Sequence, residues 1–302
     1  MRIVTYLNGG VSEPGLLIGE RIVPASAFKH EYKFMSTVQL ALTLKESRFD
    51  LSDVPQPART FPKDSVKLLS PVINPNSIRD FYAFEEHVRN ARRRRGLDME
   101  PTWYEFPVFY YSNHTAIYSP GDEIPYPRYT SKLDYELEVA CVIGKKGIDI
   151  PVENAREYIA GYMLFNDWSA RDIQAKEMRI GLGPAKSKDF AKSMGPYLVT
   201  PDEFDHTHGK GPDVELTASV NGTLYSKGNL KDLYWSFEEM IARASQEVFL
   251  YPGDVIASGT VGSGCILELG GDEKGWLKVG DVVTFEGGPM GVLSNRVGNK
   301  RS

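Results

Sequence analysis

One acidic, strand-like segment, DYELEVACVI at residues 134–143, constrains the fold of this chain more than any other feature. In a strand, successive side chains point to opposite faces. Glu136 and Glu138 then share one face with Ala140 and Val142, whereas the residues between them are apolar. One interpretation is a half-buried strand whose two glutamates lie in water. The apolar Ala140 and Val142 instead predict that the glutamate face is buried, where two adjacent carboxylates need a cation or take up protons.

Length, charge and cysteine content exclude several classes of protein. The chain has 302 residues, enough for about two domains and for a core that needs no disulfide or metal to fold. Its 35 basic and 40 acidic residues give a formal charge of −5, which offers no reason to expect nucleic-acid binding. Cys141 and Cys265 match no zinc spacing and indicate a reducing compartment. No apolar run is long enough to cross a bilayer and no signal peptide is evident, so we expect no membrane partner and a cytoplasmic location.

The distribution of strand-like and helical segments divides the chain at about residue 70. Residues 1–70 contain short β-prone runs separated by glycine-rich turns, and we expect them to form a small β-rich domain. Residues 71–302 are mainly strands, with a hairpin at Asn221-Gly222. Helical spacing of apolar residues predicts helices near 36–45 and over 237–248. The pattern therefore predicts two domains, 1–70 and 71–302, of the α+β class and mostly β.

The common nucleotide-binding and hydrolase motifs are absent from the sequence. GxxxxGK[ST] does not occur, so no P-loop is expected. GxSxG and HExxH are also missing, which removes the usual serine-hydrolase elbow and the zincin helix. Five histidines and two separated cysteines argue against a metal site built from nitrogen and sulfur ligands.

Two further segments carry candidate chemistry. The apolar run at 161–165 ends at Asn166-Asp167, where Asp167 is either a simple helix N-cap or a site residue. A helix after it places Arg171 and Gln174 on one face. Asp80 and His87 are seven residues apart, so they share a face if their segment is helical. A lone histidine in such a position is more often a surface or core residue than a catalytic one.

A run of arginines follows this histidine. It comprises Arg89, Arg92, Arg93, Arg94 and Arg95. The simple interpretation is a solvated face of a helix. The functional alternative is a clamp for a carboxylated substrate, because the guanidinium group binds carboxylates through paired hydrogen bonds.

Taken together, several motifs resemble the fumarylacetoacetate hydrolase family. In chain order they are Asp80-Phe-Tyr with His87, Tyr135-Glu136-Leu-Glu138-Val, Asn166-Asp167-Trp-Ser-Ala-Arg171-Asp-Ile-Gln174, Lys188-Asp-Phe and Ser258-Gly259-Thr260. The segment Gly264-Cys-Ile-Leu-Glu268-Leu resembles the one that carries the glutamate partner of the catalytic histidine in the hydrolase itself. The resemblance covers roughly residues 71–302. It implies a mixed β-sandwich roll of the fumarylacetoacetate hydrolase type, preceded by the small N-terminal β-rich domain, and a homodimer.

The resemblance also implies roles for individual residues. The metal ligands would be Asp80, Glu136, Glu138 and Asp167, with Asp80 as a ligand or as a holder of the ligands. The residues that activate water would be His87 and Glu268. Contacts to the substrate or to the developing oxyanion would come from Tyr82, Tyr110, Arg171, Gln174, Lys188 and Thr260. One position departs from the family pattern, because Gly96 stands where the hydrolase has an active-site arginine, and Arg94 or Arg95 would have to replace it.

An oxygen-only ligand set suits Mg²⁺ or Mn²⁺, with Ca²⁺ as a third option. The resemblance further implies a metal-dependent hydrolase that cleaves a C–C bond in an acylpyruvate-like or fumarylacetoacetate-like diketoacid. The first alternative is a lyase of the same family, either an oxaloacetate decarboxylase or a 2-keto-3-deoxy sugar acid dehydratase. The second is a homologue that binds a small molecule or a metal without catalysis.

Overall fold

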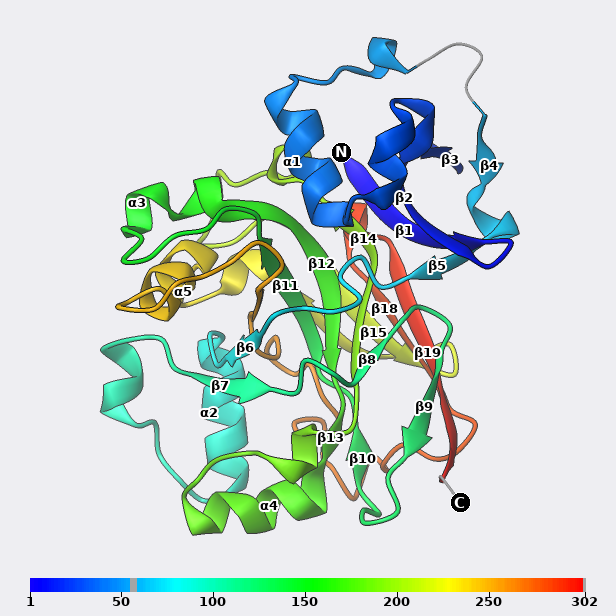
Figure 1. Cartoon of the computed structure of the whole chain (residues 1–302). Coiled ribbons are helices and arrows are strands. Elements are labelled where there is room, and N and C mark those ends of the chain that lie inside the picture. Colours follow the sequence, from blue (N-terminus) through cyan, green and yellow to red (C-terminus); the bar gives the residue numbers. More distant parts are fainter. Residues whose placement is uncertain (55–58, 301–302) are drawn as a thin grey trace.

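A computed structural model describes residues 1–54 and 59–300 of the chain (Figure 1). It is an α+β structure with more strand than helix. The helices are α1 (Thr37–Glu46), α2 (Glu85–Arg94), α3 (Val152–Ala155), α4 (Arg171–Ile180) and α5 (Phe237–Ala244). Within the described ranges no helix is both long and apolar enough to cross a membrane.

A twelve-stranded sheet forms the centre of the molecule. Most of its strands follow the order β4-β3-β2-β1-β14-β12-β11-β17-β6-β7, while β5 pairs with β1 and β8 pairs with β14. Their bounds are β1 (Arg2–Asn8), β2 (Val11–Ile18), β3 (Arg21–Pro24), β4 (Phe61–Pro62), β5 (Lys67–Leu69), β6 (Ile78–Phe81), β7 (Phe109–Ser112), β8 (Ile117–Tyr118), β11 (Leu137–Ile143), β12 (Ile159–Asp167), β14 (Lys192–Val199) and β17 (Val255–Ala257).

A five-stranded sheet lies behind the central strands of the large one (Figure 1). Its order is β16-β15-β18-β19-β9, and a separate two-stranded pair joins β10 to β13. The bounds are β9 (Glu123–Tyr126), β10 (Leu133–Asp134), β13 (Ser169–Ala170), β15 (Glu215–Val220), β16 (Thr223–Asn229), β18 (Val282–Glu286) and β19 (Val292–Lys300). The hairpin predicted at Asn221-Gly222 is confirmed, because these residues connect β15 to β16 and both have positive φ angles.

The N-terminal strands belong to the same sheet as the later ones. Residues Arg2 and Ile3 of β1 pair with Val199 and Leu198 of β14. The β-rich character expected for this region is confirmed. The boundary between two domains at residue 70 remains a prediction.

Both faces of β11 are buried, as the apolar Ala140 and Val142 on the glutamate face predicted. Leu137 and Val139 lie in the core that the two sheets share, together with Leu216 of β15 and Phe285 of β18. The opposite face packs Ala140 and its neighbours against a second core cluster, to which α1 contributes apolar side chains. Glu136 and Glu138 are 5% and 1% exposed, so the interpretation with two solvated glutamates is wrong.

Three helical features differ from the sequence-based predictions. The helix expected over 237–248 ends at Ala244, and Val248 is exposed rather than part of its buried face. Asp80 and His87 do not share a helix, because Asp80 lies in β6 and only His87 lies in α2. Asp167 is not an N-cap either, since it ends β12 and α4 begins four residues later at Arg171. In each case a sheet pairing or a chain turn overrides the local helical spacing.

Candidate active site

The register of the large sheet brings three carboxylates to one face. Asp80 of β6 pairs with Ala257 of β17, which pairs with Ala140 of β11. Directly paired residues point to the same face of a sheet, so Asp80 shares the face of Glu138, two residues from Ala140. Asp167 at the end of the neighbouring β12 lies on this face too. Carboxylates that are far apart in the sequence are therefore neighbours.

Buried cations lie between these carboxylates. Lys188, at the end of a short 3₁₀ turn, has its Nζ 2.8 Å from Oδ2 of Asp167 and also contacts Glu136. Arg171, in the first turn of α4, places Nη2 2.8 Å from Oε1 of Glu136. Its Nε donates to Oδ2 of Asp134 at 2.7 Å. Opposite charges in this buried environment fix the side chains of the cluster in one arrangement.

Hydroxyl groups complete the contacts of the cluster. Tyr110 donates to Oδ2 of Asp80 at 3.2 Å and to Asp167 at a shorter distance. Thr260 Oγ1 donates to Oε1 of Glu138 at 3.2 Å. The second oxygen of Glu138 is buried, and among the described residues it has no hydrogen-bond partner. A buried carboxylate oxygen without a partner is energetically costly.

The pKa values of the four carboxyl groups separate into two pairs. Burial and the nearby Asp167 raise the pKa of Asp80 well above its usual range. Burial, with Asp80 and Glu136 adding to it, does the same for Glu138. Burial also acts against ionisation of Glu136 and Asp167, but nearby cations together outweigh it and hold both pKa values below their usual range. Lys188 acts on both groups, with Arg171 adding to it at Glu136 and Lys192 at Asp167. The cluster therefore has two well-compensated carboxylates and two that lack a positive partner.

His87 and Glu268 form a second group beside this cluster. Nδ1 of His87 lies 2.6 Å from Oε2 of Glu268, and both side chains are buried. Because Nδ1 is bound to the carboxylate, Nε2 is the nitrogen left to accept a proton. Burial works against the charge of Glu268, but His87 and its other donors hold its pKa below the usual range.

A cavity of about 420 Å³ connects the two groups. All but two of the predicted site residues line this cavity. The lining ones are Asp80, Tyr82, His87, Tyr110, Glu136, Glu138, Arg171, Gln174, Lys188 and Thr260. The exceptions are Asp167 and Glu268, which touch the lining through Lys188 and His87. The remaining wall is largely apolar, with Val108, Met178 and Leu182 among its residues.

Arg94 and Arg95 are the two candidates to replace the family arginine that is missing at Gly96, and they differ in whether they line the cavity. Arg95 lines the cavity. Arg94 instead donates from Nη2 to the backbone oxygen of Glu268 at 3.0 Å. Of the two, only Arg95 is therefore placed to meet a ligand.

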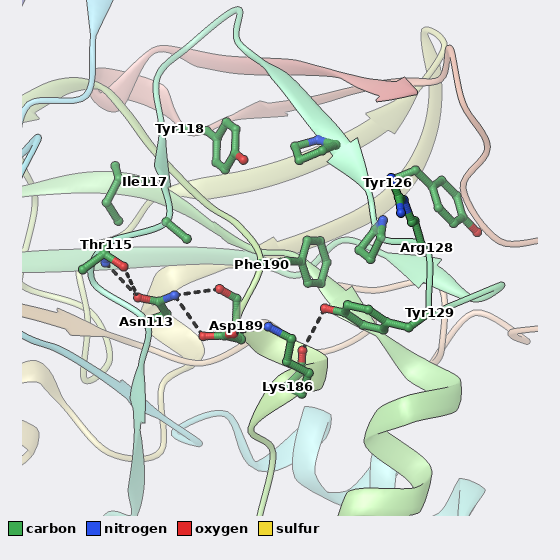
Figure 2. A pocket seen from close by; sticks show the side chains of 13 residues that line it. Asn113, Thr115, Ile117, Tyr118, Tyr126, Arg128, Tyr129, Lys186, Asp189 and Phe190 are labelled. Carbon is green, nitrogen blue, oxygen red and sulfur yellow. Dashed lines mark hydrogen bonds and ion pairs between the residues drawn. The ribbon is translucent and has the colours of Figure 1, made fainter. Parts of the chain in front are cut away.

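A larger cavity of about 650 Å³ lies elsewhere and contains none of these residues (Figure 2). Its polar groups bind one another. Asn113 donates to both the backbone and the side-chain oxygen of Asp189, at 2.8 and 2.9 Å. Tyr129 donates to the backbone oxygen of Lys186 at 3.0 Å. The smaller cavity is the candidate active site, because it alone of the two is lined by buried carboxylates, buried cations and a buried histidine.

A comparison with protein families agrees with this geometry. The family model "Fumarylacetoacetate (FAA) hydrolase C-terminal" matches residues 76–298. The chain belongs to the fumarylacetoacetate hydrolase family. The resemblance seen in the sequence motifs is thereby confirmed, and the match spans every candidate site residue.

Named relatives in the fumarylacetoacetate hydrolase family differ in activity. A mitochondrial oxaloacetate tautomerase of Xenopus laevis is 31% identical over 98% of this chain and 90% of its own. A fumarylacetoacetase of Arabidopsis thaliana is 29% identical over 83% of this chain and 74% of its own. Isomerases are also among the matches. The protein is therefore an enzyme of this superfamily, and membership alone leaves its reaction open.

Solved structures confirm the fold expected from the resemblance. A fumarylacetoacetate hydrolase from Exiguobacterium antarcticum superposes with a TM-score of 0.78, at 26% identity over 99% of this chain and all of its own. A maleylpyruvate hydrolase from Sphingobium, solved with manganese(II) and pyruvate, gives a TM-score of 0.76 at 22% identity over 100% of both chains. A protein of the same fold thus binds Mn²⁺.

The carboxylate cluster of this family member fits a divalent cation by charge and by chemistry. Five carboxylates (Asp80, Asp134, Glu136, Glu138 and Asp167) surround three cations (Lys188, Lys192 and Arg171), which leaves an excess of two negative charges when all are ionised. The unpartnered oxygen of Glu138 offers a ligand atom. Oxygen ligands are those that Mg²⁺ and Mn²⁺ prefer. The assignment of Asp80, Glu136, Glu138 and Asp167 as ligands remains a prediction.

A different trio has the most compact arrangement of possible ligand atoms. Within the described ranges, His87, Cys265 and Glu268 are the residues whose ligand atoms all lie within 4.8 Å of one another. Burial raises the pKa of the Cys265 thiol well above its usual range. A metal needs the thiolate, so this trio is better described as a hydrogen-bonded group.

Sequence reasoning missed two buried residues of the site. Lys192 has its Nζ 2.7 Å from Oδ1 of Asp167. Asp134 binds Arg171 and accepts hydrogen bonds from the backbone nitrogens of Ile266 and Leu267 at 2.8 and 3.0 Å. A buried-strand pattern beginning with a lysine was a possible signal for Lys192. Nothing local marked Asp134, because its partners lie 37 and 132 or more positions away.

Proposed function

We propose that this protein is a divalent-metal-dependent hydrolase that cleaves a C–C bond in a 2,4-diketoacid of the acylpyruvate type. The observation that carries the proposal is the buried pair of His87 and Glu268, which opens on the same cavity as the carboxylate cluster and Lys188. Hydrolysis needs a base that makes water nucleophilic. A histidine whose Nδ1 is held by a carboxylate, and whose Nε2 makes no hydrogen bond to the described residues, suits this task.

The metal would be held by Glu136, Glu138 and Asp167, with Asp80 as a ligand or as a holder of the ligands. Bound there, it would polarise the dicarbonyl of the substrate as a Lewis acid. Mg²⁺ and Mn²⁺ are the candidates, with Ca²⁺ as a third. Support comes from the excess negative charge of the cluster and from the unpartnered oxygen of Glu138.

The side chains then divide the remaining work. His87 removes a proton from water through Nε2, and Glu268 stabilises the imidazolium that forms. The water oxygen attacks the distal carbonyl carbon. The bond between that carbon and the central CH₂ carbon then breaks, and its electron pair leaves with the pyruvate part as an enolate. The imidazolium returns a proton to the former CH₂ carbon, so the products are pyruvate and a carboxylic acid. Lys188, Arg171 and Gln174 hold the negative oxygens of the substrate and the enolate.

The size and lining of the cavity support a substrate with an acyl arm. About 420 Å³ falls within the range of ~300–1,000 Å³ typical of sites for larger organic ligands. A four-carbon acid such as oxaloacetate leaves much of this space unfilled. Ala91, Val108, Met178 and Leu182 provide apolar contacts for an arm beyond the dicarbonyl.

The second candidate is an oxaloacetate tautomerase. The observation that favours it is the Xenopus relative, which aligns with nearly the whole chain. Keto–enol conversion moves a proton and breaks no C–C bond, so the same histidine serves without an attacking water. Oxaloacetate decarboxylation and sugar-acid dehydration, the lyase alternatives, also need no attacking water.

A substrate panel tests the proposal. The purified protein with Mg²⁺ or Mn²⁺ is given acylpyruvates, oxaloacetate in its enol and keto forms, and a 2-keto-3-deoxy sugar acid. We expect pyruvate and a carboxylic acid in equal amounts from acylpyruvates, with ¹⁸O from labelled water in the carboxylic acid. Accelerated enol-to-keto conversion of oxaloacetate, or release of CO₂ from it, without cleavage of any acylpyruvate would overturn the hydrolase assignment.

The family resemblance also implies a homodimer. Light scattering of the same preparation tests this expectation.

A further inference from the structure

Glu268 has a full set of donors, and His87 is only one of them. Oε2 of Glu268 accepts hydrogen bonds from Nδ1 of His87 at 2.6 Å and from Sγ of Cys265 at 3.4 Å. Oε1 accepts hydrogen bonds from Nδ2 of Asn90 at 3.2 Å and from the backbone nitrogen of Ser263 at 3.0 Å. Each carboxylate oxygen therefore has two hydrogen-bond partners. The whole residue Glu268 is only 9% exposed. A buried carboxylate held on all sides cannot rotate away from the histidine.

These donors come from two separate elements. α2 supplies His87 and Asn90, which lie one helical turn apart on the same face. The turn after β17 supplies Ser263, whose φ is +60°, together with Cys265. Through Cys265, the turn after β17 thus makes a hydrogen bond to Oε2 of Glu268, the oxygen that His87 also binds.

The same turn is also fixed from its other side. The backbone nitrogens of Ile266 and Leu267 donate to Asp134, which binds Arg171 in the first turn of α4. Arg94 donates to the backbone oxygen of Glu268 at 3.0 Å. The position of the turn is therefore coupled to the residues that hold the substrate, and the side chain of Glu268 depends on Cys265 and Asn90 for its final orientation.

We infer that Cys265 and Asn90 are positioning residues that hold the carboxylate of Glu268 against Nδ1 of His87. The inference rests on the proposed function, in which this pair activates water. Burial keeps the Cys265 thiol protonated by raising its pKa, an effect that the guanidinium of Arg171 opposes and that Glu268, Asp134 and Glu136 reinforce. The thiol is therefore a hydrogen-bond donor rather than a nucleophile or a metal ligand.

Kinetics of Cys265→Ala and Cys265→Ser test this role. The thiol is a weak donor, so its hydrogen bond to the carboxylate should contribute about 0.5–1.5 kcal/mol. Cys265→Ala should then lower kcat for acylpyruvate cleavage by about 2–10-fold and leave KM within about 2-fold. Cys265→Ser keeps a donor of similar size and should restore most of kcat. Asn90→Ala should cost about as much as Cys265→Ala.

The pH profile separates positioning from general loss of stability. A carboxylate with fewer donors holds the imidazolium proton more firmly, so the acidic limb of kcat/KM should move to higher pH in Cys265→Ala. Cys141→Ala is the matched control, because Cys141 is equally buried but lies on β11 in the core between the sheets. Its kcat and pH profile should equal those of the parent, even if its Tm falls.

NMR keeps the test independent of any substrate. The proton between His87 and Glu268 should give a low-field imidazole signal, assigned by its loss in His87→Ala, and Cys265→Ala should shift it whereas Cys141→Ala should not. A parental kcat and an unmoved signal in Cys265→Ala, or equal changes in Cys141→Ala, would overturn the inference. If the parent cleaves no acylpyruvate but the signal responds as expected, the proposed function fails and the positioning role stands.

Discussion

Lys192, the first residue of β14, lies directly opposite Asp167, the last residue of β12, with 2.7 Å between Nζ and Oδ1. Both side chains are fully buried. Nζ of Lys192 also donates to the backbone oxygens of Ala191, at 3.1 Å, and of Lys188. This one ammonium group thus joins a proposed metal ligand to the segment that carries Lys188, and the cross-strand register fixes its place.

Replacing Lys192 should destabilise the whole fold. Lys192→Met leaves Asp167 with one cationic partner fewer inside the protein, and removing one member of a buried pair typically costs 3–5 kcal/mol. We expect the free energy of unfolding, measured by urea titration, to fall by about that amount. Lys186→Met is the control, since Lys186 and Asp189 form an exposed pair at 2.6 Å and its loss should cost under about 1 kcal/mol. Equal losses in the two variants would contradict the prediction.

The sequence alone was sufficient to predict the buried carboxylates at the start of β11. The apolar Ala140 and Val142 continue the face of Glu136 and Glu138, and burial of that face follows from this local pattern. The hairpin at Asn221-Gly222 and the helix near residues 36–45 are equally local signals. Such features depend on neighbours within a few residues, so they can be recognised without knowing the fold.

Other parts of the site depend on pairings that no local pattern encodes. Asp80 reaches the cluster because β6 pairs with β17 in parallel, which joins segments about 180 residues apart in the sequence. The spacing of Asp80 and His87 instead suggested a shared helix face, which is wrong. Asp134 and Lys192 were missed for the same reason, because their functional partners become neighbours only when the sheet forms.

Metal binding should depend on Glu138 and Asp80. Glu138→Gln keeps the shape but replaces the unpartnered oxygen and its charge, and Asp80→Asn removes a charge from the cluster. We expect calorimetric titration with Mn²⁺ to show at least ~10-fold weaker binding for each, the lower end of the range for supporting residues. Asp272→Asn, at an exposed pair with Lys132, is the control and should bind as the parent does. Parental affinity in both site variants would show that Glu138 and Asp80 do not contribute to metal binding. Full activity of the parent in excess chelator would show that the enzyme needs no metal.

The affinity for the metal should rise with pH. Burial raises the pKa of Asp80 and of Glu138, so each binds more protons near neutral pH than an exposed carboxyl group does. A cation must displace these protons, so affinity increases as pH rises through their pKa values and then levels off. Titration in two buffers with different ionisation enthalpies measures the protons released. Affinity that is constant between pH 5 and pH 8, with no proton release, would contradict this expectation.

Arg95 should contribute to binding of a substrate with a distal anionic group. It follows the last residue of α2 and lines the cavity, whereas Arg93 within α2 is not part of the lining and is the matched control. Loss of a charged hydrogen-bonding partner typically costs about 1.5–3 kcal/mol, so Arg95→Ala should raise KM for a carboxylated acylpyruvate by about 10-fold or more. KM for an acylpyruvate with a hydrocarbon arm should change little. Identical kinetics of Arg95→Ala and Arg93→Ala on both substrates would mean that the arginine run is a solvated face.

His87 and Glu268 decide between hydrolysis and the reactions that need no attacking water. General-base assistance typically contributes about 10²–10⁴-fold, so His87→Ala should reduce acylpyruvate cleavage by that factor while Mn²⁺ binding stays at the parental value. Glu268→Gln keeps the geometry and loses the charge that supports the imidazolium, so it should reduce the rate in the same direction but less. Decarboxylation of oxaloacetate, if the parent performs it, should fall much less in both variants because no water must be deprotonated. The exposed His208 offers a control, and His208→Ala should leave every rate unchanged. Parental cleavage rates in both His87→Ala and Glu268→Gln would show that this pair does not activate water, and the hydrolase mechanism would then be wrong.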